Sequence, residues 1–170
     1  NIQIEGVRTG PRSVAWKPSK PAMLVWTEAL DGGDPNVKAE HRDRLIALSA
    51  PFQSDPEPLL KTEHRALGMS VMQDPSMVVV TDYDRDRRWV QMKLYDLDQP
   101  DQEPIIMMDR SIRDRYDDPG SIVMVPDETG HVRALQDGDW IYRIGSGASP
   151  KGNLPFIDRQ NIETQETQRL

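Results

Sequence analysis

The sequence contains no cysteine, which excludes disulfides, thiolate metal sites and cysteine nucleophiles and leaves the compartment open. Basic residues are also in deficit, because 21 Lys and Arg stand against 28 Asp and Glu and the net charge is −7. A nucleic-acid-binding domain needs a basic surface that displaces counterions, so we expect no nucleic-acid partner. No apolar run approaches the ~18 residues that a spanning helix needs, so we expect no membrane partner either.

Short alternating apolar segments dominate what is present. Residues 23–29 and 45–48 alternate with period two, and Val90, Met92 and Leu94 share one face while Trp89 and the residues that alternate with it share the other. The 14 prolines and 11 glycines fall between these segments, where they mark turns. Residues 31–33, 128–130 and 137–138 read as tight turns, and residues 109–115 form a short turn at most. The sequence therefore predicts an all-β fold.

Two phrases of the sequence recur. Glu57-Pro58-Leu59-Leu60 returns as Glu103-Pro104-Ile105-Ile106, and Ser13-Val14-Ala15-Trp16 returns as Ser70-Val71-Met72-Gln73 and more faintly from Ser121. Repeats of roughly 40 to 50 residues built of short strands are typical of β-propeller blades. We therefore predict about three blades of antiparallel strands, at residues 12–66, 67–115 and 116–170.

Three blades are fewer than the roughly four to eight that close a propeller. We therefore expect residues 1–170 to be a fragment of one propeller domain. The irregular stretches 32–40 and 145–153 should lie on the rims of the blades, where loops carry function. An open arc leaves the outer faces of its end blades without neighbours, so we also expect self-association or marginal stability.

Several phrases in the same order resemble glutamyl endopeptidase-like peptidases of the prolyl oligopeptidase family. They are Gly6-Val7-Arg8-Thr9-Gly10-Pro11-Arg12, Glu28-Ala29-Leu30-Asp31-Gly32-Gly33-Asp34-Pro35, His41-Arg42-Asp43, Asp109-Arg110-Ser111, Asp114-Arg115-Tyr116 and Gly147-Ala148-Ser149-Pro150. In that family a β-propeller caps a C-terminal α/β-hydrolase domain that carries a serine triad. The resemblance implies that this chain is part of the propeller and that the catalytic domain of the same protein is its partner.

The chain itself has no Gly-x-Ser-x-Gly elbow. The nearest phrase, around Ser149, has one residue too many, and Pro150 lacks the amide that an oxyanion hole requires. We therefore predict no catalytic residue here, and a fragment that hydrolyses nothing. In the parent serine peptidase, which would cleave peptides after Glu, the segment would act as a lid that admits short or unfolded peptide substrates.

Two other functions stay open. A propeller can serve as a protein interaction module without any enzymatic role. A hydrolase pattern after position 170 would favour the peptidase, whereas further blades alone would favour the interaction module. A carbohydrate-active propeller is the weaker alternative, because no pair of catalytic carboxylates stands out among the acids.

Three other groups of residues resemble functional motifs but do not complete them. His41-Arg42-Asp43 resembles the start of a kinase catalytic loop, but the magnesium-binding Asn of that loop would fall at position 48, where this chain has Leu48. A structural role beside a rim loop is therefore favoured. Asp82, Asp84 and Asp86 imitate a calcium loop, but Arg87 and Lys93 occupy ligand positions and a solvated hairpin tip is favoured. The three histidines have no paired spacing. We predict no metal and no cofactor.

The charged segment after position 108 offers the one candidate substrate contact. Arg110, Arg113 and Arg115 alternate with acids, and a structural salt-bridge network is the default interpretation. A guanidinium that faces the central cavity could instead bind a substrate carboxylate through two hydrogen bonds. That role would suit a peptidase that prefers acidic side chains.

Overall fold

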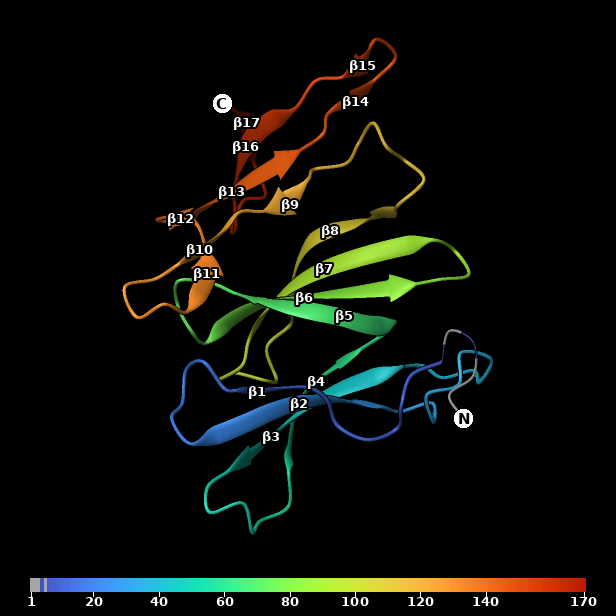
Figure 1. Ribbon diagram of the computed structural model, residues 1–170, viewed down its shortest axis with the longest axis vertical. Coiled ribbons are helices and arrows are strands. Elements are labelled where there is room, and N and C mark those ends of the chain that lie inside the picture. The colour runs from blue at the N-terminus through green and yellow to red at the C-terminus, as the bar shows by residue number, and fades with distance from the viewer. Residues whose placement is uncertain (1–3, 5) are drawn as a thin grey trace.

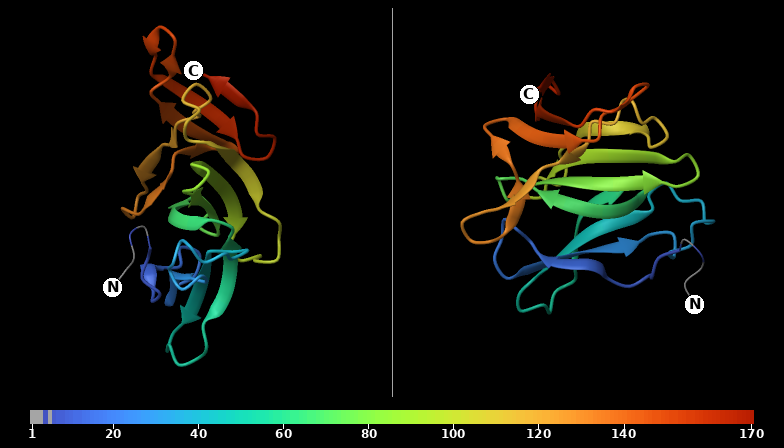
Figure 2. Two further views of the ribbon diagram at one scale, coloured as in Figure 1. Left: turned by 90° about the vertical axis from the view of Figure 1, so that its right-hand side faces the viewer. Right: turned by 45° about the horizontal axis from the view of Figure 1, so that its top comes forward.

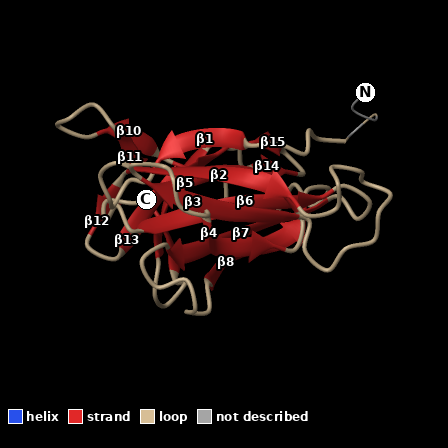
Figure 3. Cartoon of the chain, turned by 90° about the horizontal axis from the view of Figure 1, so that it is seen from below, coloured by secondary structure: helices blue, strands red, loops and turns tan. Residues whose placement is uncertain are grey.

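The computed structural model describes residue 4 and residues 6–170 of the chain. These residues form strands, turns and loops, and no helix occurs among them, as Figure 3 shows. The all-β class predicted from the alternating pattern is therefore confirmed.

Two consecutive four-stranded antiparallel sheets make the first two blades. The first blade consists of β1 (Arg12–Trp16), β2 (Met23–Ala29), β3 (Asp43–Ser49) and β4 (Glu57–Thr62). The second blade consists of β5 (Arg65–Val71), β6 (Met77–Asp84), β7 (Trp89–Asp96) and β8 (Ile105–Ser111). Each strand pairs with the next strand in sequence, which is the meander of a propeller blade.

The third blade is a meander interrupted by two small hairpins. Its first strand is split into β9 (Ser121–Ile122) and β12 (Gln136–Asp137), which both pair with β13 (Trp140–Gly145), and β16 (Phe156–Asn161) and β17 (Thr167–Arg169) complete the sheet. One hairpin, β10 (Met124–Pro126) with β11 (Val132–Ala134), interrupts the first strand. The other, β14 (Ala148–Ser149) with β15 (Gly152–Asn153), lies between β13 and β16. The stretch 145–153, which we expected to be irregular, therefore contains a hairpin.

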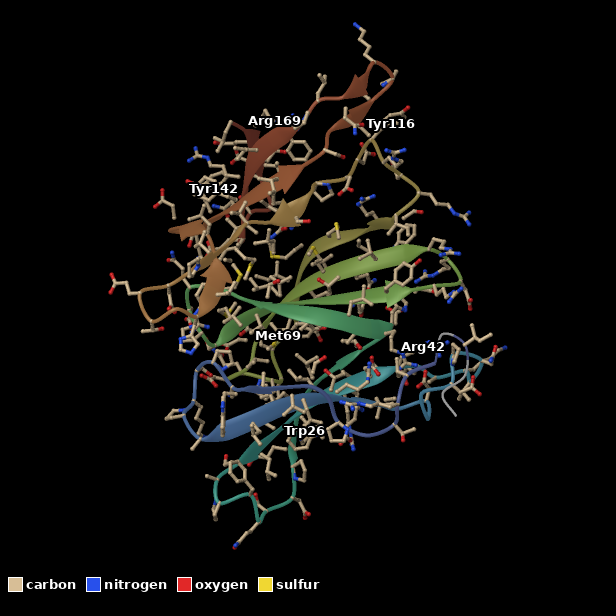
Figure 4. All side chains as sticks on the ribbon, in the orientation of Figure 1. Trp26, Arg42, Met69, Tyr116, Tyr142 and Arg169 are labelled. Carbon is tan, nitrogen blue, oxygen red and sulfur yellow. The ribbon has the colours of Figure 1, made fainter. Side chains whose placement is uncertain are left out.

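The blades follow one another along the long axis of the molecule and form an open arc (Figures 1 and 2). Alternation along β6 explains how they hold together, because Val78 and Val80 pack against the first blade while Val79 packs against the third. One apolar core thus fills each of the two junctions between blades. Met69 borders the first core (Figure 4). A central blade buried on both faces and an arc of sheets establish a partial β-propeller.

The recurring phrases do lie on equivalent strands of the first and second blades. The alignment of the phrases, however, differs by two residues from the alignment that the strand pairing gives. Strand pairing aligns Met23, Val25 and Thr27 of β2 with Met77, Val79 and Thr81 of β6. In that alignment Ala15 corresponds to Ser70, whereas the Ser-Val phrase pairs Ser13 with Ser70. A slip of two residues keeps every side chain on its own face, so the phrases still predicted the correct strands.

The connections that follow a second or a fourth strand of a blade all emerge on the same edge of the three sheets, where those strands end. We call this edge the loop face; it carries the β2–β3, β4–β5, β6–β7, β8–β9 and β13–β16 connections, on the right in Figure 1. The longest connections, residues 30–42, 112–120 and 146–155, are all on it. Arg42 and Tyr116, labelled in Figure 4, both lie on this side.

Candidate functional site on the loop face

A buried ion-pair cluster ties the long β2–β3 connection to the first and second blades. Asp43, fully buried at the start of β3, accepts hydrogen bonds from Arg12, from Arg65 at 2.6 Å and from the amide of Ala66. Arg65 also reaches Asp31 at 2.6 Å through its other terminal nitrogen. One guanidinium therefore bridges two buried carboxylates, one of them in the long connection and the other in the sheet.

Asp31 is the centre of the turn that opens the β2–β3 connection. Its carboxylate accepts from Arg42 at 2.8 Å and from the amide of Gly33 at 3.0 Å. Burial by itself raises the pKa of Asp31, but the hydrogen bonds from Arg65 and Arg42 outweigh burial and hold that pKa below its usual value. Asp31 is therefore ionised, and its charge fixes the base of the connection.

Gly33 allows the N-terminal segment to lie against this turn. Its φ is +74°, and an added Cβ would fall 2.0 Å from the carbonyl oxygen of Val7. Val7 in turn donates its amide to the carbonyl of Gly33 at 2.9 Å. Only glycine fits this contact, which fastens the segment before β1 to the loop face.

A polar groove of about 880 Å³ opens between β4 of the first blade and the β6–β7 region of the second. His41, His64, Arg87, Lys93 and Tyr95 line it together with several acids. His64 is buried, and its Nε2 lies 2.9 Å from a terminal nitrogen of Arg87. A guanidinium can only donate, so Nε2 of His64 is the acceptor in this contact.

The structure corrects the interpretation of the aspartate triplet. Asp82 lies inside β6, is only 3% exposed and faces the first blade, so it does not belong to a solvated hairpin tip. Asp84 ends the strand and pairs with Arg87 at 2.5 Å, and only Asp86 is on the exposed turn. Alternation along β6 is the physical reason, because it points residue 82 inwards like Val78 and Val80.

The predicted arginines are all placed after or at the end of β8, in two different environments. Arg110 donates to the carbonyls of Ser111 and Asp114 and pairs with Asp118 at 2.9 Å. These contacts hold the backbone of the β8–β9 connection in place. Arg113 and Arg115 are exposed on that connection. The structure thus brings all three to the loop face but turns only two towards solvent.

A second groove, of about 1100 Å³ and more apolar, opens between the second and third blades. Met92, Met108, Gly120 and Phe156 are among its lining residues. Next to it, Arg143 is 1% exposed and donates to Gly120 at 3.1 Å and to Gln160 at 2.7 Å. Burial lowers the pKa of Arg143 to about 10, and the charge of Asp118 opposes that effect. The β8–β9 connection is therefore held at both ends by arginines.

The remaining candidates have structural contacts. The hydroxyl of Ser149 donates to the carbonyl of Gly152 at 2.6 Å within the β14–β15 hairpin, so its proton is committed to the backbone. Arg42 and Asp43 open β3 beside the long connection, as the sequence predicted. Across residues 4 and 6–170, no group of three His, Asp or Glu side chains is arranged to hold a metal ion. In the same range no helix is long and apolar enough to cross a membrane.

Two curated relatives match almost the whole chain. The probable chloroplastic glutamyl endopeptidase of Oryza sativa subsp. japonica is 35% identical over 179 residues, which is 99% of this chain and 19% of the relative. The probable chloroplastic glutamyl endopeptidase of Arabidopsis thaliana is 34% identical over 180 residues, again 99% of this chain and 18% of the relative. Over almost its full length the chain is similar to one segment of these glutamyl endopeptidases. It spans about a fifth of the length of the curated relatives it matches.

No family model matches this glutamyl endopeptidase-like segment. Among solved structures, the uncharacterized protein lmo1340 of Listeria monocytogenes EGD-e superposes with a TM-score of 0.59 at 10% identity. The superposition covers 99% of this chain and 43% of that one. At this identity the similarity concerns the fold alone.

Sequence reasoning missed the residues that hold the loop face together. Asp31, Asp43 and Arg65 belong to different strands and connections, and their side chains meet only after the first blade has packed against the second. The repeated Met-x-Val-x-Thr pattern of β2 and β6 was the available signal for the correct blade alignment. With the blades aligned in this way, Asp43 at the start of β3 becomes a candidate ion-pair partner for Arg65 at the start of β5.

Proposed function

We propose that the chain is a non-catalytic propeller segment of a serine peptidase of the prolyl oligopeptidase family that cleaves peptides after Glu. In this role the propeller is a lid over a C-terminal α/β-hydrolase domain and admits short or unfolded peptides. The observation that carries the proposal is the match of almost the entire chain to glutamyl endopeptidases, together with its blade architecture. The apolar cores that fill the junctions between blades support a lid, because a lid excludes folded proteins only if its blades stay together.

The test compares the full-length protein with the isolated chain on an unstructured peptide that carries either Glu or Gln at one position. The expected result is cleavage after Glu by the full-length protein and none by the chain. A folded domain that contains the same Glu in an exposed loop tests the lid, and it should be cleaved far more slowly than the peptide. Equal rates on the peptide and the folded domain would refute the lid, and an inactive full-length protein would refute the peptidase.

Within this proposal, substrate contact falls to the β8–β9 connection. Arg113 and Arg115 are exposed on the loop face, where a carboxylate could approach them, whereas the contacts of Arg110 favour a positioning role. Guanidinium groups bind carboxylates through paired hydrogen bonds. Changing both Arg113 and Arg115 to Gln in the full-length protein should reduce its preference for Glu over Gln, and Lys20→Gln on the opposite edge is the matched control.

The alternative function is an interaction module, and the outer faces of the end blades favour it. Trp16 is 62% exposed and contacts Phe52 on the first blade, while Ile144 and Ile157 are each 51% exposed on the third. Exposed apolar surface of this kind marks an interface. Loss of a specific protein partner after a change at these positions, with peptide cleavage unchanged, would favour this alternative.

A further inference from the structure

Two buried oxygen atoms lie at the junction between the first and second blades without a hydrogen-bond donor. They are Oδ1 of Asp82 and Oε1 of Gln91, in residues that are 3% and 8% exposed. Asp82 and Gln91 are directly opposite each other in the β6–β7 pairing, so their side chains share the face towards the first blade. Cβ atoms in such a pair are about 4.5–5.5 Å apart, which places the two polar ends within reach.

The amide of Gln91 is oriented by a third residue. Its Nε2 donates to Oδ1 of Asp109 on β8 at 3.2 Å, and a carboxylate can only accept. A flipped amide would place two acceptors against each other, so Oε1 must point away from Asp109. Oε1 therefore remains an acceptor that needs a donor from the side of β6.

The charged groups around Asp82 do not supply this donor. Among the residues that the structure describes, only the backbone amide of His64 donates to the other oxygen of Asp82, at a long 3.4 Å. Around it lie His64 and Glu63 from the β4–β5 connection, Lys93 and Tyr95 from β7, Asp84 and Arg87 from the end of β6 and its turn, and Asp109 from β8. Arg65 on β5 is already committed to Asp31 and Asp43.

A proton on the carboxyl group would satisfy both orphaned oxygens at once. Burial raises the pKa of Asp82, and the opposing charges of His64 and Lys93 do not cancel that effect.

We propose that Asp82 is a proton-binding site at the junction of the first two blades, where it stays a neutral acid and donates through Oδ1 to Oε1 of Gln91. When pH rises through the raised pKa, two acceptors are left facing each other beside a buried charge, and the junction under the polar groove loosens. The folded state binds the proton more tightly than the unfolded chain does, so this stabilisation is complete at low pH and disappears as pH rises.

Amide hydrogen exchange tests this in the full-length protein, read by mass spectrometry on peptides that cover residues 77–96 and corrected for the intrinsic exchange rate. As pH rises from about 4, the unfolded pKa of an Asp, to about 9, we expect the wild type to lose about tenfold or more in protection. Asp82→Asn should keep constant protection, because its amide donates to Gln91 at every pH. Asp82→Ala should be poorly protected throughout, and Asp86→Asn on the exposed turn should follow the wild type.

Constant wild-type protection over that range would overturn the proposal without reference to any variant. It would also be overturned if the profile of Asp82→Asn ran parallel to that of the wild type, or if this variant were as poorly protected as Asp82→Ala. The measurement reads no catalytic activity, so it is independent of the proposed peptidase function.

Discussion

Leu59 and Met107 occupy the same position in successive blades. Each is the unpaired residue of a bulge in the fourth strand, because Leu45 pairs with Leu60 and Ile46 with Pro58, as Met92 pairs with Met108 and Lys93 with Ile106. Each is buried in the core against the following blade. The bulge turns an extra apolar side chain inwards where a regular strand would not.

We therefore predict that Leu59→Ala and Met107→Ala each lower the free energy of unfolding by about 2–5 kcal/mol. The exchanges Leu59→Met and Met107→Leu should cost less than about 1.5 kcal/mol, since they conserve volume. Urea unfolding of the chain measures all four. A small cost for both alanine variants would mean that the bulges do not hold the junctions together.

Removal of Arg65 should destabilise the fold more than removal of any exposed arginine. Arg65→Met leaves Asp31 and Asp43 buried with one cation fewer, and breaking a buried pair costs about 3–5 kcal/mol. Arg65→Lys should recover part of this loss, because one ammonium cannot span both carboxylates. Exposed Arg115→Met is the control, and equal unfolding midpoints for Arg65→Met and Arg115→Met would contradict the prediction.

Gly33 and its neighbour Gly32 form a matched pair for testing the close contact at Val7. Both have positive φ, so alanine strains the backbone at either site by roughly 1–2 kcal/mol. Only Gly33→Ala also drives a Cβ into the carbonyl of Val7, since nothing lies within 4 Å of a Cβ at Gly32. Gly33→Ala should therefore melt clearly below Gly32→Ala in calorimetry, and identical melting temperatures would show that the N-terminal segment moves away freely.

Lowering the pH should weaken the ion-pair cluster, because it protonates the carboxylate of Asp31. Its pKa is lowered in the folded state, so the stabilisation is present above the unfolded pKa of about 3.9 and disappears as pH falls through the folded pKa. Asp31→Asn should be less stable than the wild type at neutral pH and should lose less stability on acidification. A parallel acid dependence of the two proteins in urea unfolding would exclude Asp31 as a source of the effect.

Self-association of the isolated chain should depend on Trp16. Trp16→Glu places a charge on the exposed face of the first blade and should shift the chain towards monomer in sedimentation experiments. Val132→Glu, at a 57% exposed position of the β10–β11 hairpin, is the control and should leave association unchanged. A wild-type chain that is monomeric at high concentration would contradict the prediction.

The strands and their order were predictable because alternation and turn residues are local properties. Residues 128–130 do lie in the turn of one hairpin and Gly138 in the turn of the next, and Val90, Met92 and Leu94 do share one face. The two-residue slip of the repeated phrases escaped sequence reasoning, because short similarities within a strand do not fix its pairing. Asp82 was misjudged for a related reason, since its burial depends on the neighbouring blade rather than on its own hairpin.

The site was less predictable than the fold. Arg110, Arg113 and Arg115 stay a prediction as substrate contacts, and so do the peptide substrate and the hydrolase domain as partners. No local pattern separates Arg110, which binds backbone carbonyls, from Arg113, which is exposed. That distinction arises from the path of the β8–β9 connection, whose last residue, Gly120, accepts a hydrogen bond from Arg143 on the next blade.

The hairpin inserted in the first strand of the third blade is a place where one loop sequence could be replaced by another. Leu135 donates its amide to the carbonyl of Val123 at 2.7 Å, which closes the base of the inserted hairpin, while Ala134 anchors it in the core. The tip at residues 127–131 is exposed apart from Asp127, and its hydrogen bonds within the described part of the chain are to itself and to Arg133. Loops of other lengths could therefore be grafted at this tip, so that the propeller gains a new binding element without a change to any blade.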